Sequence, residues 1–100
     1  MTLRQKQSKF VGMVARLIDF AHGHGYELTF GDAYAKTGHM KNSLHYKRLA
    51  IDLNLFQEGV YLTQTDDHLP IGEYWESIGG SWGGRFNDGN HYSLEHNGRK

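Results

Sequence analysis

The chain of 100 residues has no cysteine, no net charge and no long apolar run. The absence of cysteine excludes disulfide bonds and thiolate metal sites. Lysine plus arginine and aspartate plus glutamate number 11 each. This balance argues against a nucleic-acid-binding protein, because such domains carry a basic patch and a high pI. No segment approaches the roughly 20 apolar residues of a membrane span, so we expect no stable membrane association.

The N-terminal residues 1–9 are polar and basic and lack the apolar centre of a signal peptide. We therefore expect the protein to be made in the cytoplasm, so that a second protein must release it if its substrate lies outside. The length predicts a single domain, residues 1–100, with a modest core. A bound metal would then contribute to stability as well as to chemistry.

Hydrophobic periodicity predicts a small α+β domain, with an N-terminal helix and one further helix packed on a mainly antiparallel sheet. Residues 4–22 have apolar side chains at helical spacing and end at two glycines. Residues 70–78 have Pro70 near the start of the second predicted helix. Four strands are expected, at residues 26–30, 49–56, 60–62 and 91–95, with the first of them reaching toward Tyr34. Between them we expect a loop over residues 35–44, a turn at 58–59 and an irregular segment over 82–88.

The segment 49–56 gives the clearest strand. Its odd-numbered residues are apolar, whereas Asp52 lies on the opposite face among small and polar side chains. An unpaired carboxylate inside a core is costly. Asp52 is therefore expected on the floor of a cleft.

Two histidines can join Asp52 there. His45 lies seven residues before Asp52, and this odd spacing would put the two on opposite faces of one continuous strand. His45 must therefore come from the incoming loop and fold back over the sheet edge. His91 begins the last predicted strand, which we expect beside 49–56. Two imidazoles and one carboxylate with an open fourth position suit a hydrolytic zinc site.

A second carboxylate, Asp88, lies three residues before His91 across Gly89-Asn90. A tight turn there can place the carboxylate beside the metal without binding it. Such a group can take a proton from the attacking water and pass it to the leaving amine. Asp88 is therefore the candidate general base.

The combined pattern, Ser43-x-His45 with Asp52 seven residues later and then Asp88-x-x-His91, resembles the zinc D-alanyl-D-alanine carboxypeptidase and dipeptidase family. It is most similar to the small phage endolysins of that family that are L-alanyl-D-glutamate peptidases. The resemblance implies a fold shared with lysostaphin-type peptidases and the hedgehog domain, with Zn²⁺ in an open cleft. It also implies that His45, Asp52 and His91 bind zinc and that Asp88 is the base.

One departure concerns a basic residue. The family often carries Tyr-Arg after its first strand, where the arginine steadies the substrate carbonyl, but this chain has Tyr34-Ala35. Lys36 and Arg48 are the candidates for supplying that charge. Ser43 is a further candidate for contacting substrate, and capping of a loop is the equal alternative.

The function implied is hydrolysis of peptidoglycan stem peptides, with the L-Ala–D-Glu bond favoured. The setting implied is phage lysis, in which a monomeric endolysin is released from the host cytoplasm by a holin-like partner. Such an enzyme would also have antimicrobial action. Three alternatives stay open: a D-Ala-D-Ala carboxypeptidase or dipeptidase, a non-catalytic wall-binding module that keeps zinc as a structural element, and a structural phage component that carries a wall-cutting domain.

Overall fold

The computed structural model describes residues 1–38 and 43–100. The first element is α1 (Leu3–Gly23), which begins with a capping box between Thr2 and Gln5. Its buried stripe faces the sheet and consists of Phe10, Met13, Val14, Leu17 and Ala21. The predicted N-terminal helix is confirmed, one residue longer at each end.

The sheet is entirely antiparallel, and β2 (Ala50–Gln57) is its central strand. One end of β2 pairs with β1 (Glu27–Phe30) and with the hairpin partner β3 (Val60–Leu62). Its other end pairs with β5 (His91–Ser93), which pairs in turn with β4 (Ser81–Trp82). The predicted strands and the hairpin are confirmed, although β1 ends at Phe30 and does not reach Tyr34.

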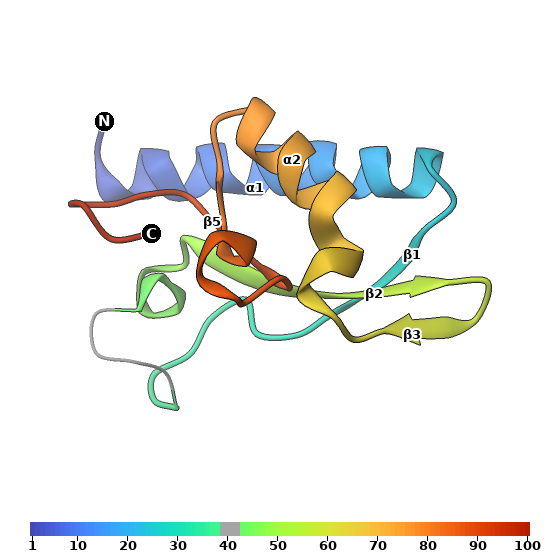
Figure 1. Ribbon diagram of the computed structural model, residues 1–100. Helices are drawn as coiled ribbons and strands as arrows, with labels where there is room; N and C mark the ends of the chain where they lie inside the picture. Colours follow the sequence, from blue (N-terminus) through green and yellow to red (C-terminus); the bar gives the residue numbers. More distant parts are fainter. Residues whose placement is uncertain (39–42) are drawn as a thin grey trace.

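Both helices cover the same face of this sheet (Figure 1). The second helix, α2 (Leu69–Ser77), has Pro70 in its first turn as predicted. Trp75 of α2 is fully buried, and its indole N–H donates to the carbonyls of Ser81 and Ser93. The α+β class with two helices is therefore confirmed. Neither helix combines the length and the apolar character that crossing a bilayer would need.

The structure adds short elements that the sequence pattern did not reveal. Three 3₁₀ turns lie at Leu44–Lys47, Thr65–His68 and Gly83–Phe86. The prediction of an irregular segment over 82–88 is therefore wrong at its start, where β4 leads into a 3₁₀ turn. Of the predicted loop 35–44, residues 39–42 lie outside the described residues.

Candidate metal and catalytic site

His45 lies on the 3₁₀ turn Leu44–Lys47, immediately before β2. The Ser43 hydroxyl accepts a hydrogen bond from the His45 backbone N–H at 3.3 Å, which caps the turn. Buried Leu44 anchors the turn, and its carbonyl accepts from the Leu49 N–H at 3.0 Å. His45 thus folds back beside the sheet as predicted, from a helical turn where a loop was expected.

Asp52 and His91 face each other across two paired strands, because they are register partners of β2 and β5. The backbone of Asp52 is also fixed on its other side, where its N–H donates to Asp32 O at 2.9 Å and its carbonyl accepts from Gly31 N–H at 2.7 Å. Directly opposite residues of an antiparallel pair project to the same face. The sheet itself therefore sets the spacing of this carboxylate and this imidazole.

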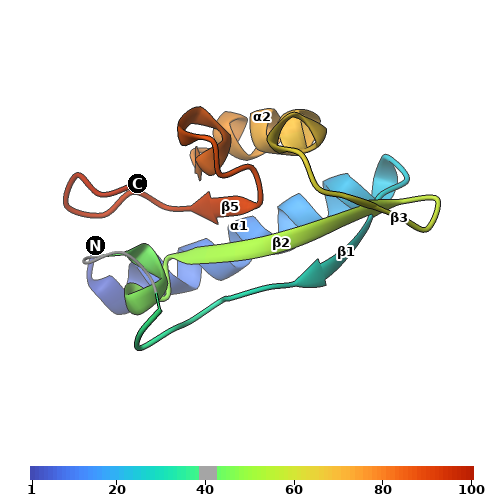
Figure 2. The same ribbon diagram turned by 60° about the horizontal axis from the view of Figure 1, so that its bottom comes forward.

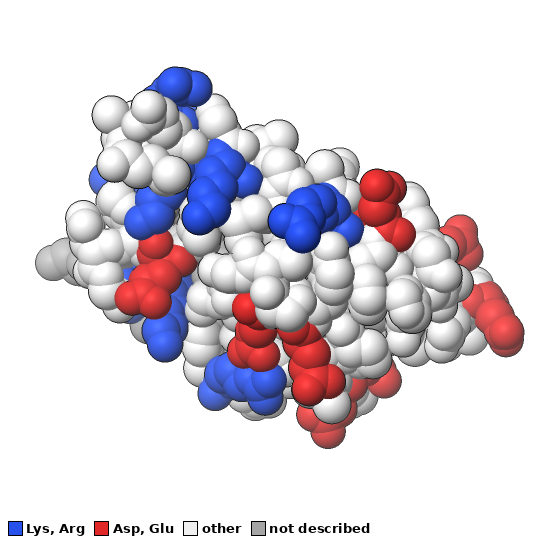
Figure 3. Space-filling model, turned by 90° about the horizontal axis from the view of Figure 1, so that it is seen from above, with Lys and Arg blue, Asp and Glu red and all other residues white. Residues whose placement is uncertain are grey.

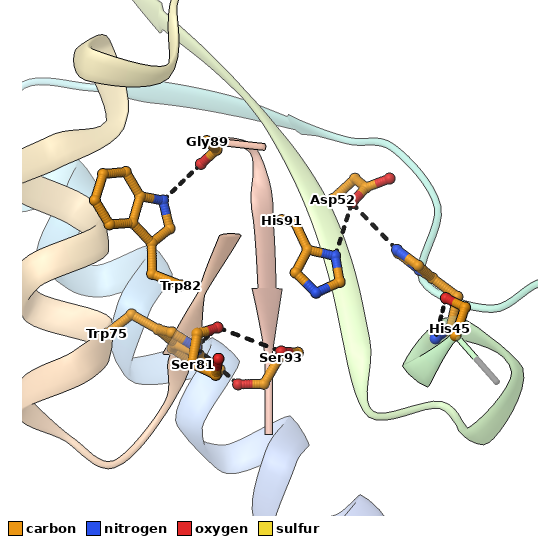
Figure 4. A network of polar contacts seen from close by, with 9 residues as sticks. His45, Asp52, Trp75, Ser81, Trp82, Gly89, His91 and Ser93 are labelled. Atoms are coloured by element: carbon orange, nitrogen blue, oxygen red, sulfur yellow. Dashed lines mark hydrogen bonds and ion pairs between the residues drawn. The ribbon is translucent and has the colours of Figure 1, made fainter. Parts of the chain in front are cut away.

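The three side chains converge on one point (Figure 4). Asp52 Oδ1 lies 3.3 Å from His45 Nε2 and 3.8 Å from His91 Nδ1. One donor atom from each of the three residues lies within 4.8 Å of the other two, and they form the one such group in the described part of the chain. Tetrahedral zinc with bonds of 2.0–2.2 Å separates its ligand atoms by about 3.4 Å. The donors present therefore fit a zinc ion in both chemistry and spacing.

The electrostatics of Asp52 favour the ionised form that a metal needs. Partial burial raises the pKa of this carboxyl, but hydrogen bonds and charge interactions with His45 and His91 outweigh burial and lower the pKa to about 2. The Asp52 side chain is 21% exposed, whereas both imidazoles are almost fully buried. His91 Nε2 has no hydrogen-bond partner among the described residues. Asp52 is therefore ionised near neutral pH, the form in which a carboxylate binds a metal.

Asp88 lies on the turn that leads into His91. The turn is closed by the His91 N–H, which donates to the Asp88 carbonyl at 3.1 Å, as the predicted tight turn requires. Trp82 Nε1 donates to the Gly89 carbonyl at 2.7 Å and joins this turn to the core (Figure 4). A Cβ on Gly89 would lie 2.6 Å from the Thr65 Cα, so only glycine allows this close approach. The exposed Asp88 carboxylate is thus carried on a well-fixed backbone.

The metal group and Asp88 line one cleft of about 170 Å³. Phe86 forms part of its wall and is half exposed, whereas Trp82 belongs to the core. The described residues that line the cleft are Ser43, Leu44, His45, Asp52, Phe86, Asp88, His91, Arg99 and Lys100. The structure therefore brings together His45, Asp52, Asp88 and His91, the four residues that sequence analysis placed at the site.

The candidate substrate-binding residues are more scattered. Ser43 lines the cleft, although its hydroxyl also caps the turn of His45. The Arg48 guanidinium lies 4.2 Å above the Tyr34 ring and lines a separate apolar hollow. Lys36 is exposed and is not among the described residues that line the cleft. The expected basic charge at the cleft thus comes from neither Arg48 nor Lys36 in this structure.

Sequence reasoning missed the two basic residues that do line the cleft, Arg99 and Lys100. The available signal was the dipeptide Asn97-Gly98, which strongly favours a tight two-residue turn. The structure also buries His68, whose side chain is 4% exposed and whose Nδ1 lies 2.8 Å from the Tyr92 hydroxyl. Burial lowers the pKa of His68, which favours its neutral imidazole.

Comparison with known families gives one match. A family model described as D-alanyl-D-alanine carboxypeptidase matches residues 37–94, more than half of the chain. The matched segment contains the three candidate ligands and Asp88, whereas Arg99 and Lys100 lie beyond it. A search of curated proteins found no match.

Proposed function

The chain belongs to the D-alanyl-D-alanine carboxypeptidase family and is a zinc peptidase; from this premise we propose that it is an endopeptidase that cuts the L-Ala–D-Glu bond of peptidoglycan stem peptides. In this proposal His45, Asp52 and His91 hold the metal and Asp88 is the general base. The whole of residues 1–100 acts as one peptidase domain.

The observation that supports endopeptidase action is that residues lining the cleft also line two further hollows. Asp88 also lines a polar hollow of about 220 Å³ formed by segments 61–65 and 87–90. On another side, Phe86, Arg99 and Lys100 line a hollow that shares no residue with the first. A substrate can therefore extend past the metal group both ways, as cleavage inside a peptide requires. A carboxypeptidase needs room for only one residue beyond the bond.

The chain's own residues divide the chemistry between them. Zinc held by the three side chains supplies a Lewis acid, which polarises the scissile carbonyl and makes water nucleophilic near neutral pH. Asp88 accepts the proton of the attacking water on a carboxylate oxygen and later donates it to the leaving amine nitrogen.

A digest of purified peptidoglycan by the zinc-loaded protein tests this proposal, with Asp88→Asn as the control. We expect mass spectrometry to find new D-Glu amino termini that are missing from the control digest. Released D-alanine would instead establish the second candidate, a D-Ala-D-Ala carboxypeptidase, which the description of the matched family favours. A folded, zinc-loaded protein that releases neither product would overturn both.

We also propose that the peptidase acts as a monomeric phage endolysin, released from the host cytoplasm by a holin-like partner. The support is the similarity of its His45, Asp52, Asp88 and His91 pattern to small endolysins. Expression in bacteria with and without a co-expressed holin tests this setting. Lysis only when both are present, and only with intact Asp88, is the expected result; lysis that is independent of Asp88 would contradict it.

A further inference from the structure

The end of the chain folds back on itself next to the cleft. The His96 N–H donates to Arg99 O at 3.0 Å, and the Arg99 N–H donates to His96 O at 2.9 Å. Asn97 and Gly98, between them, have φ values of 50° and 79°. Positive φ at both central residues is the geometry of a type I′ turn, which Asn-Gly favours. Residues 96–99 therefore form a small hairpin, called the tail hairpin here, which turns back beyond β5 (Figure 2).

The tail hairpin is attached to the rest of the molecule at its base. Leu94 is buried, and its N–H donates to the Leu49 carbonyl at 2.9 Å, just before β2. The Lys6 ammonium of α1 lies 3.3 Å from His96 Nδ1. These contacts fix the direction in which the tail returns, and they bring Arg99 to the cleft that holds Asp52 and His91.

The net charge of the cleft indicates which kind of chemical group it binds. Zinc would bring two positive charges to a cleft whose described lining has two carboxyl side chains, Asp52 and Asp88, and two basic ones, Arg99 and Lys100. Arg99 and Lys100 therefore leave the metal-loaded cleft with an excess of positive charge. On the face that Figure 3 shows, lysine and arginine side chains are also more frequent toward the end where α1 begins, and acidic side chains predominate toward the other end. The end that carries the tail hairpin therefore attracts an anionic group.

We propose that Arg99 binds the carboxylate of the substrate residue whose nitrogen leaves in the cleavage; this rests on the proposed function. In D-alanyl-D-alanine that residue has a free terminal carboxylate. The D-glutamate of a stem peptide has two carboxyl groups, of which only one continues the chain. A guanidinium can bind such a carboxylate through two parallel N–H···O bonds. Arg99 is thus a substrate-positioning residue that the family match over residues 37–94 does not include.

The position of Arg99 favours this role over contact with the scissile carbonyl. Besides the cleft, Arg99 lines the two hollows outside it, one beside Leu44 and Lys47 and one beside Phe86. Its side chain therefore stands at the rim, along the path of the flanking part of a substrate. Arg99 is also partly buried whereas Lys100 is exposed, so less side-chain freedom is lost when Arg99 binds.

The test compares two substrates and two variants. The substrates are a stem-peptide fragment with its D-glutamate carboxylate free and the same fragment with that group as a primary amide. Loss of a charge-assisted contact predicts that Arg99→Ala lowers kcat/KM on the free acid about 10- to 100-fold. On the amide we expect less than about a threefold change. Arg16→Ala removes the same charge from an exposed position on α1 and should change neither rate.

A binding measurement keeps the inference separate from the proposed function. The wild-type protein is titrated calorimetrically with the D-glutamyl product peptide and with its amide, which requires no turnover. Arg99→Ala should weaken binding of the acid alone. Equal losses on acid and amide would show that Arg99 contacts some other part of the product and would overturn the inference, as would no loss on either. If the wild type cuts neither substrate but binds the acid through Arg99, the proposed function fails and this inference stands.

Discussion

Asp52 and His91 lie on paired strands, whereas Asp88 and Arg99 lie on turns at the rim of the same cleft. The first pair is held by the hydrogen bonds of β2 and β5, and the packed face of the sheet lies directly behind it. The second pair is exposed or partly exposed and depends on two short turns. The difference separates two tasks. Metal binding needs fixed distances, whereas proton transfer and substrate positioning need access to solvent and to a passing chain.

The largest expected effect is on the strand-held pair. Removing one of three ligands in His91→Ala or Asp52→Ala should abolish stoichiometric zinc binding and lower activity by more than about 100-fold, since changes to groups that merely orient a ligand already cost 10- to 100-fold. Metal analysis of the purified variants, with circular dichroism to monitor folding, checks this. Full zinc occupancy in either variant would remove that residue from the ligand set.

Asp88→Asn should lower catalytic activity without affecting zinc binding. The amide has nearly the same shape but cannot accept a proton, so kcat should fall about 10²- to 10⁴-fold. Zinc content and thermal stability should stay close to those of the wild type, because the carboxylate is exposed and the turn is held by its backbone. Loss of zinc together with activity would show that Asp88 is a ligand, and the contrast between strand and turn would then disappear.

Two separate glycine substitutions test how strongly the core supports the turn that carries Asp88. A Cβ on Gly72 of α2 would lie 2.1 Å from the Trp82 ring, and Trp82 holds the Asp88 turn through Gly89 O. Gly72→Ala should therefore lower the free energy of unfolding by about 1–3 kcal/mol and reduce activity as well. Gly12→Ala, on the open side of α1, should raise stability by about 0.5–1 kcal/mol. Chemical denaturation measures both; equal effects would contradict the packing seen around Trp82.

The last prediction concerns the stability of the zinc-free protein in acid. Because the pKa of Asp52 is lowered from 3.8 to about 2, its ionised form stabilises the folded, zinc-free protein at pH values above 3.8. This contribution is lost as the pH falls from about 4 toward 2, and it amounts to about 2 kcal/mol. Chemical denaturation of the zinc-free wild type and of Asp52→Asn at several pH values measures this contribution to the free energy of unfolding. The two curves should converge at low pH, and a constant gap would rule out this role of Asp52.

Most of the fold could be predicted from periodicity, because α1 and β2 repeat their apolar residues over many positions. The residues of the metal group were also visible, since Asp52 lies on the polar face of a clear strand and Asp88-x-x-His91 leads into another. The convergence of His45 was predicted, but its 3₁₀ turn was not. Four residues fixed by one cap and one buried leucine leave little pattern in a sequence.

The elements that escaped prediction are short and depend on distant contacts. The strand Ser81–Trp82 is two residues long and exists because it pairs with β5. Burial of His68 depends on Tyr92, which lies 24 positions later. The place of Arg99 depends on a turn and on the direction in which Leu94 leaves the sheet. Local propensity contains none of this information, apart from the Asn97-Gly98 turn signal.

The opposed positions of Asp52 and His91 have a consequence for how the protein reaches its native state. A slip of one residue between β2 and β5 would turn one of these side chains to the other face of the sheet and leave a metal with too few donors. Only the correctly paired chain binds zinc tightly, so mass action by the ion enriches that pairing over its competitors. Zinc would therefore favour the native register of β2 and β5 over pairings that separate Asp52 from His91.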